Sequence, residues 1–363
     1  MNFALSDEQE LLREAARGAL SRVKTVEAAR AALDGAALPD LWPVALRAGW
    51  PGMLATEEHG GAGLGLMDAM LVFAELGRVL ASVPLLGHLP ASWLLDRAGH
   101  PAVEALATGE RRAAFVPARP PTAIEEAWTV DSRVGMRRPG SPALKEARVT
   151  GEVAWVPDAP GADVLVVACA EGRVALVSGA EAVVEPVTRY DGTRSLGHVR
   201  FDGARAEVVE ADAAAAWHIA QALLGAESLG AAERALETSV AYAKERFTFG
   251  RPIGSYQAIK HELVEVLRRL ENARSLMYYA GWAGQDVPAE LPLAASAFRL
   301  VAGEALDHAA RTQISVHGGI GATWEHDAPL YFRRAQLSRR LLGRAQDGAD
   351  RVADELFAAA RAA

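Results

Sequence analysis

Apolar residues recur at helical spacing at both ends of the chain and at strand spacing in its middle. Over residues 6–33 they recur every three or four positions, which is the period of an amphipathic helix. Ser6 precedes this pattern, and a serine hydroxyl at that place can cap the helix. Further helices are predicted at 40–49 and 91–108. The pattern therefore predicts an N-terminal α-helical domain over residues 1–111.

The pattern changes near residue 112. Over 147–203, apolar residues alternate with polar ones or form short runs, and Gly, Pro and Asp separate the pieces. This arrangement is typical of short antiparallel strands joined by turns. We therefore predict a middle β-domain over residues 112–206, either a small barrel or a sandwich.

A helical period returns after residue 210. Two long helices are predicted first, a third is expected to start at Pro292, and a fourth to span 329–360. Four long helices with short links are typical of an antiparallel bundle, here over residues 207–363. The predicted fold class is α+β multidomain, with N-terminal helices, a middle β-barrel or sandwich, and a C-terminal four-helix bundle.

Composition and charge narrow the classes of function. The chain has 363 residues and a net charge of −8, without a Lys/Arg-rich tract, so a nucleic-acid partner is not expected. Its one cysteine, Cys169, excludes an internal disulfide, which fits a reducing cytoplasm. Neither a signal peptide nor a membrane span is predicted. No histidine spacing matches a metal site, and the arginines at 333, 334, 339, 340 and 344 are interpreted as a solvated or interface face.

The stretch KERFTFGRPIGSYQ, residues 244–257, lies between two predicted long helices. A helix turn needs only a Gly or a Pro, yet this one also carries Arg246, Thr248, Phe249 and Arg251. One interpretation is a helix hairpin with its phenylalanines in the core and its arginines solvated. The other is a ligand corner, because arginine and a hydroxyl suit a pyrophosphate and phenylalanine suits a flat ring.

A second stretch, ISVHGGIGATWEH, begins at residue 314 and contains Gly318, Gly319 and Gly321. Glycines can end a helix. They can also let a backbone approach a ligand closely and donate N–H bonds to phosphate.

The two stretches together resemble the acyl-CoA dehydrogenases, and the resemblance covers nearly the whole chain. It implies a fold of α-domain, β-domain and helical bundle, a bound FAD, and formation of a double bond between C2 and C3 of an acyl-CoA. It also implies that FAD lies across a subunit interface, with its ADP half held by one chain and its ring by the neighbour. Electron-transfer flavoprotein is the expected electron acceptor.

The resemblance assigns roles to particular residues. Trp155 would lie against the flavin ring. The ADP half of FAD would be held by Arg246, Thr248, Phe249 and Gln257, together with the loop residues Ser315, Val316, Gly318 and Gly319.

The catalytic equipment of the family is missing from its usual positions. The catalytic Glu of most members would stand at Leu342, and the alternative Glu of some relatives at Ala220. Glu227, seven residues further on, is the one weak candidate base. The Thr expected near flavin N5 is Pro157, and the stretch Phe115–Ala118 replaces a TEP-type motif.

This combination resembles the shorter subunit of bacterial heterotetrameric acyl-CoA dehydrogenases that act on bulky thioesters such as steroid side chains. The main hypothesis is therefore a chain that completes an FAD site while a second acyl-CoA dehydrogenase chain supplies the catalytic Glu. Two alternatives remain open at this point. One is a self-sufficient homotetramer that uses an atypical base, and the other is a flavin-free binding or scaffold protein.

Overall fold

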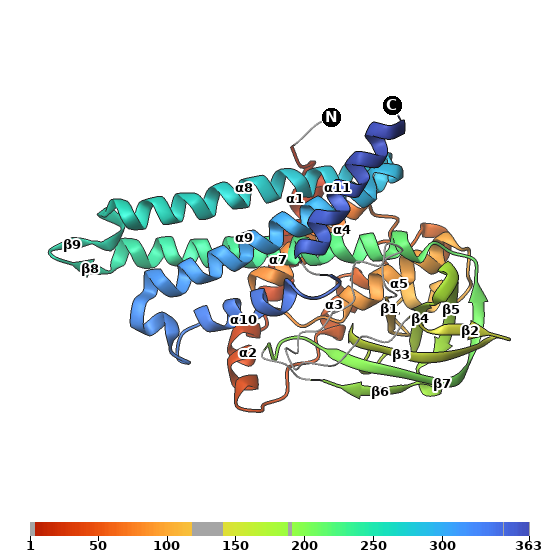
Figure 1. Cartoon of the computed structure of the whole chain (residues 1–363). Coiled ribbons are helices and arrows are strands. Elements are labelled where there is room, and N and C mark those ends of the chain that lie inside the picture. Colours follow the sequence, from red (N-terminus) through yellow and green to blue (C-terminus); the bar gives the residue numbers. More distant parts are fainter. Residues whose placement is uncertain (1–3, 118–140, 188–190, 344, 363) are drawn as a thin grey trace.

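The computed structural model describes residues 4–117, 141–187, 191–343 and 345–362. Helices form the N-terminal part, a sheet follows, and long helices form the C-terminal part (Figure 1). Ser6 caps the first helix as predicted, since its Oγ accepts a hydrogen bond of 3.2 Å from the Gln9 amide. The N-terminal helices are α1 (Asp7–Ser21), α2 (Thr25–Leu33), α3 (Trp42–Arg47), α4 (Leu66–Arg78), α5 (Leu85–Arg97) and α6 (Val103–Ala107).

Two N-terminal helix predictions need correction. The helical pattern over 6–33 belongs to two helices, because α1 ends at Ser21 and α2 begins at Thr25. The helix predicted at 91–108 is also two, α5 and α6. Gly99 lies between α5 and α6. Its φ of 63° is in the left-handed region, which glycine adopts readily, and the chain changes direction there.

The middle sheet has the strand order β1-β4-β5-β7-β3-β2, and β6 also pairs with β7. The strands are β1 (Ala113–Val116), β2 (Ala143–Lys145), β3 (Arg148–Pro157), β4 (Val164–Ala168), β5 (Val174–Ser178), β6 (Val183–Pro186) and β7 (Leu196–Val209). The antiparallel prediction holds for the described pairs except one, since β1 and β4 run parallel. Because β7 continues to Val209, the strands extend beyond the predicted limit at 206. The domain boundaries themselves stay a prediction.

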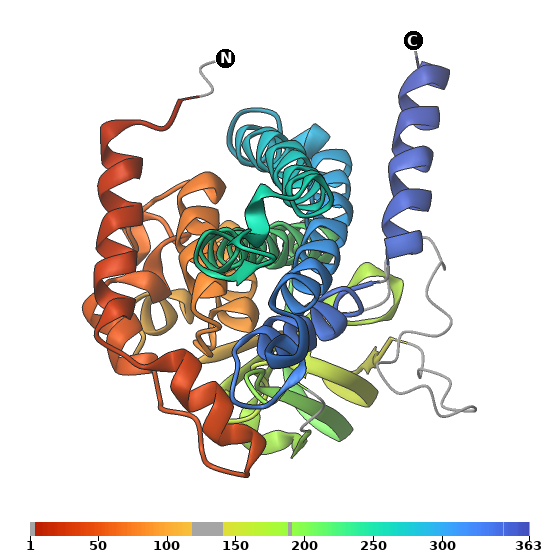
Figure 2. The same ribbon diagram turned by 90° about the vertical axis from the view of Figure 1, so that its left-hand side faces the viewer.

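The C-terminal helices are α7 (Ala213–Glu245), α8 (Gln257–Asp286), α9 (Leu291–His317), α10 (Ala328–Ser338) and α11 (Ala345–Ala362). The first three run lengthwise beside one another (Figure 1), and α11 stands at the edge of the bundle (Figure 2). The single fourth helix predicted at 329–360 is wrong. A turn separates α10 from α11, because Leu342 and Gly343 have φ values of 57° and 112°, and a right-handed helix cannot continue through such angles.

Two glycines bring α4 and α7 into close contact. A Cβ atom on Gly77 would lie 1.9 Å from the Glu227 carbonyl oxygen, and one on Gly230 would lie 1.8 Å from that of Ala74. Any larger side chain would force these helices apart. This contact fixes Glu227 in the interior between the N-terminal helices and the bundle.

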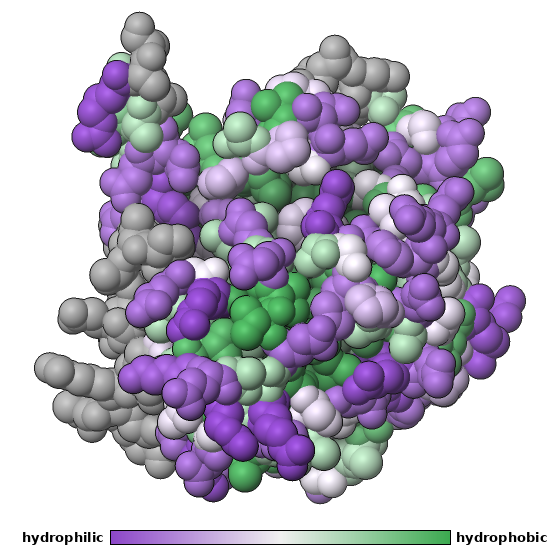
Figure 3. Space-filling view, turned by 90° about the vertical axis from the view of Figure 1, so that its right-hand side faces the viewer, coloured by the Kyte–Doolittle hydropathy of each residue, from purple (hydrophilic) through white to green (hydrophobic). Residues whose placement is uncertain are grey.

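At the sheet end of the molecule, apolar side chains gather in the middle of the face, with polar side chains around them (Figure 3). None of the helices in the described part of the chain combines the length and the apolar composition that a membrane span requires.

Candidate functional site

The stretch singled out in the sequence forms a small β-hairpin at the end of the bundle away from the sheet (Figure 1). It consists of β8 (Phe247–Thr248) and β9 (Arg251–Pro252). Phe249 and Gly250 join the two strands with φ values of 48° and 78°, which is the positive-φ pair of a type I′ turn. The hairpin is braced by the Tyr256 hydroxyl, which donates to the Thr248 carbonyl at 3.1 Å.

The aromatic side chains of this hairpin face solvent. Phe249 is 92% exposed and Phe247 is 59% exposed. The interpretation in which phenylalanines fill the core at this turn is therefore wrong. Large apolar side chains left in water are typical of a surface that is covered by a ligand or a partner.

The glycine loop lies beside the base of the hairpin. Helix α9 ends at His317, and η7 (Gly318–Ala322) follows. The His317 ring stacks on Tyr242 of α7 with 4.4 Å between the ring centroids, and Tyr242 is four residues before Arg246. The fold therefore brings together the two stretches that the sequence suggested would act together.

The glycine loop has room for a ligand. Gly318 has φ 64° and ψ −136°, a conformation that side chains strongly disfavour. A Cβ atom on Gly318 or Gly319 would meet nothing within 4 Å. Among the other predicted ADP-contacting residues, Val316 is buried beneath the loop, whereas Arg246, Thr248, Gln257 and Ser315 are exposed. A guanidinium, a hydroxyl, an exposed ring and open glycine backbone are groups that fit the ADP half of FAD.

Trp155 lies far from this corner. It belongs to β3 at the sheet end, while α7 alone extends the bundle by about 50 Å at 1.5 Å per residue. Its ring is 2% exposed and packs edge-on against His198 at 4.5 Å. One FAD molecule therefore cannot contact Trp155 and the hairpin of the same chain, and Trp155 offers it no exposed face.

A hydrogen bond links the two segments in which the family would carry a catalytic Glu. Gln221, next to Ala220 in α7, donates from Nε2 to the Leu342 carbonyl oxygen at 2.5 Å. Leu342 and Ala220 are buried, at 3% and 1% exposed. Neither side chain can accept a proton, and the neighbouring amide of Gln221 is engaged in a hydrogen bond within the chain.

Glu227 lies in a buried cluster of charges. Its Oε2 accepts from Arg194 at 2.5 Å, and its Oε1 accepts from Arg334. Arg334 also bonds Asp191 at 2.8 Å. Burial disfavours the charges of this cluster, but the attraction between opposite charges overrides it. Glu227 and then Asp191 raise the pKa of Arg334, and Arg334 and then Arg194 lower the pKa of Asp191. With both oxygens engaged by guanidinium groups, Glu227 is better suited to a structural role than to proton abstraction.

This cluster was missed at the sequence level. Arg334 was interpreted as part of a solvated or interface face, yet it is 1% exposed. Asp191 and Arg194 lie in a loop more than a hundred residues away, so spacing along α10 gave no signal of them. Ala118 and Arg344, also considered in the sequence, lie outside the described residues.

Little space remains beside this cluster. Asp158, Arg194 and Glu227 help to line a cavity of about 20 Å³. Asp158 accepts a hydrogen bond of 2.8 Å from the Gly87 amide near the start of α5. Burial raises the pKa of Asp158 to about 7.

Two family models match parts of the chain at its N-terminal and C-terminal sides. A family model described as "Acyl-CoA dehydrogenase, C-terminal domain" matches residues 213–357, and one described as "Acyl-CoA dehydrogenase, N-terminal domain" matches residues 6–109. The chain is 32% identical to acyl-CoA dehydrogenase IpdE2 of Mycolicibacterium smegmatis, covering 97% of this chain and 100% of that protein. It is 34% identical to IpdE2 of Mycobacterium tuberculosis, covering 97% and 98%.

Solved structures with the same fold include a chain of the ChsE4-ChsE5 complex from Mycobacterium tuberculosis. It has a TM-score of 0.84 and 26% identity, covering 98% of this chain and 99% of that chain. The Tcur3481-Tcur3483 steroid ACAD has a TM-score of 0.85 and 25% identity, with the same coverage.

Proposed function

We propose that this chain, which belongs to the acyl-CoA dehydrogenase family, is one subunit of a heteromeric enzyme of that family. The family comprises oxidoreductases that act on acyl-CoA, with FAD as the cofactor. In the proposed enzyme, this chain holds the ADP half of an FAD whose ring lies in a second, different chain. That second chain supplies the catalytic Glu.

The proposal rests on a contrast between the hairpin with its glycine loop and the place of the family base. The hairpin and glycine loop keep an exposed cation, an exposed ring and open backbone, all suited to ADP. At the place of the family base, Ala220 and Leu342 are buried around a side-chain-to-backbone hydrogen bond. The chain is thus equipped for one half of an FAD site and not for abstraction of a proton.

The contribution of this chain to the reaction is binding and orientation. FAD, when bound, would supply the hydride acceptor for oxidation of the acyl chain. Arg246 would neutralise pyrophosphate charge, the Gly318–Gly319 backbone would donate hydrogen bonds to it, and Phe249 would cover the adenine. Fixing the ADP half in this way would hold the cofactor in register with the partner's catalytic groups.

The names of the relatives support a proposal for the class of substrate. Because the matched proteins include a heteromeric complex and a steroid ACAD, we infer a bulky acyl-CoA, such as a steroid-derived thioester, as the substrate. Electron-transfer flavoprotein as the acceptor and a location in the bacterial cytoplasm stay predictions.

The test is purification of the chain alone and after co-expression with candidate acyl-CoA dehydrogenase chains. We expect the chain alone to be colourless and inactive. With the correct partner we expect a stable heteromer with flavin absorbance and acyl-CoA-dependent reduction of a dye. A yellow, active homomer would instead support the self-sufficient enzyme, and absence of flavin with every partner would support the scaffold protein.

A further inference from the structure

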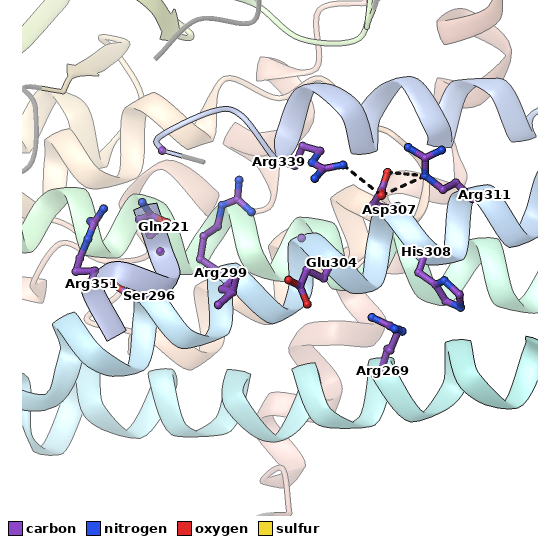
Figure 4. A pocket seen from close by; sticks show the side chains of 14 residues that line it. Gln221, Arg269, Ser296, Arg299, Glu304, Asp307, His308, Arg311, Arg339 and Arg351 are labelled. Carbon is purple, nitrogen blue, oxygen red and sulfur yellow. Dashed lines mark hydrogen bonds and ion pairs between the residues drawn. The ribbon is translucent and has the colours of Figure 1, made fainter. Parts of the chain in front are cut away.

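A cleft in the bundle lies apart from the hairpin and the glycine loop. It has a volume of about 320 Å³ and is bordered by α7, α8, α9 and α11 and by the turn that follows α10 (Figure 4). A cleft of this size is at the small end of the range for metabolite sites. Its lining carries the guanidinium groups of Arg269, Arg299, Arg311, Arg339 and Arg351, the imidazole of His308, and two carboxylates, Glu304 and Asp307.

Arg299 differs from the other arginines of the cleft. It is 7% exposed, and its recorded bonds go to backbone carbonyl oxygens, those of Ser338 and, at 3.3 Å, Leu341. Its Nε has no hydrogen-bond partner among the described residues. The guanidinium passes close to Gly303, where a Cβ atom would lie 2.8 Å from Nη1, so a larger residue at that position would displace it.

The carboxylates near the cleft do not neutralise Arg299. Asp307 already pairs with Arg311 at 3.2 Å and with Arg339 at 3.3 Å. Glu304 is exposed, and the structure records no bond between it and Arg299. Burial first, and then the charge of Arg194, lower the pKa of Arg299 to about 10, and the opposing charge of Glu227 offsets only part of this. A buried cation that forms no direct ion pair is costly, and an anion in the cleft would reduce that cost.

We propose that this cleft binds a small organic anion, through a carboxylate or phosphate group that contacts the guanidinium of Arg299. A planar guanidinium with a free N–H is suited to such oxyanions. Arg269 in the lining would add attraction, and the Ser296 hydroxyl, which has no hydrogen-bond partner among the described residues, offers a donor. An anion bound here would also steady the 339–343 turn, because Arg299 already bonds two carbonyl groups of that region.

The test is calorimetric titration of the protein, in the assembly in which it purifies, with citrate and separately with inorganic phosphate at constant ionic strength. We expect saturable binding of at least one of them, which also distinguishes a carboxylate ligand from a phosphate ligand. Arg299→Met should weaken that binding by about tenfold or more, the loss expected for one charge-assisted hydrogen bond.

A matched pair of variants keeps the test decisive if Arg299→Met does not fold. Arg268 and Arg269 both pair with Glu265, but only Arg269 lines the cleft. Arg269→Gln should therefore weaken anion binding several-fold while Arg268→Gln leaves it unchanged. Absence of saturable binding of both anions, or equal effects of these two substitutions, would overturn the proposal.

Discussion

Glu227 shows how the surroundings of a residue decide its role. Its carboxylate is buried between Arg194 and Arg334. Removing one charge from such a cluster leaves the others uncompensated, which typically costs about 3–5 kcal/mol. We therefore expect Glu227→Gln to lower the free energy of unfolding by roughly this amount, measured by urea denaturation at pH 7.

The matched control is Glu265→Gln in α8. Glu265 also bonds two arginines, Arg268 and Arg269, but these pairs lie at the surface, where ion pairs contribute little. No comparable shift of the urea midpoint is expected. Full stability of Glu227→Gln together with lost activity would instead identify Glu227 as a catalytic base.

Asp158 predicts a pH dependence of stability. Burial raises its folded-state pKa from 3.8 to about 7, so the folded state favours the protonated carboxyl. The contribution of this group to the free energy of unfolding is present below pH 4 and is lost as the pH rises toward 7.

The variant Asp158→Asn keeps an oxygen for the Gly87 amide and removes the charge. The difference in free energy of unfolding between Asp158→Asn and the wild type should shift in favour of the variant by about 2–3 kcal/mol from pH 5 to pH 8. Urea unfolding at both pH values measures it. Parallel pH profiles for the two proteins would show that Asp158 does not titrate in this range.

At the scale of single elements, a substitution in the β8–β9 hairpin can change FAD binding without changing the stability of the fold. Phe249 is 92% exposed, so Phe249→Ser should leave the free energy of unfolding within about 0.5 kcal/mol. If the ring covers the adenine of FAD, the same change should lower the flavin content of the purified heteromer, measured as the ratio of flavin to protein absorbance.

A control variant for the hairpin is Val264→Ser in α8. Val264 is also exposed, at 62%, but it lies outside the hairpin and the glycine loop. It should keep the flavin content of the wild type. Equal flavin content in the Phe249 and Val264 variants would remove Phe249 from the proposed site.

The elements also show what the sequence could and could not predict. The two candidate stretches could be singled out because their chemistry is concentrated in a few neighbouring residues, although the β8–β9 hairpin itself was not predicted. The break between α10 and α11 was not predictable, since leucine favours helix and nothing local requires Leu342 to adopt a φ of 57°. The Leu342 carbonyl is bonded by Gln221, 121 residues away. The partners of Arg334 were hidden in the same way, because Asp191 and Glu227 come from distant segments.

At the scale of the whole molecule, the decisive property is the separation of its two ends. The groups that suit ADP lie at one end of the bundle, and Trp155 and the sheet lie at the other (Figure 1). One FAD cannot reach both ends, so under the proposed function its two halves would be held by different chains. The sequence could suggest this through its family resemblance, but the distance between the two ends became apparent only from the length and direction of α7.

This separation, together with the ion cluster around Glu227, predicts the result of restoring the missing carboxylate. Leu342→Glu places an acid at the position of the family base. We nevertheless expect the chain alone to show no acyl-CoA-dependent dye reduction, because a catalytic base would still lack a complete FAD site and space for the acyl chain. The ion cluster of Glu227 and Arg334 occupies the interior between α4, α7 and α10, and the adjoining cavity is about 20 Å³, too small for a bulky acyl chain. Leu342→Gln is the control for any change in folding, because glutamine has nearly the same shape as glutamate but carries no charge. If Leu342→Glu were active and Leu342→Gln inactive, the chain would possess a complete acyl site, and its proposed dependence on a partner would be wrong.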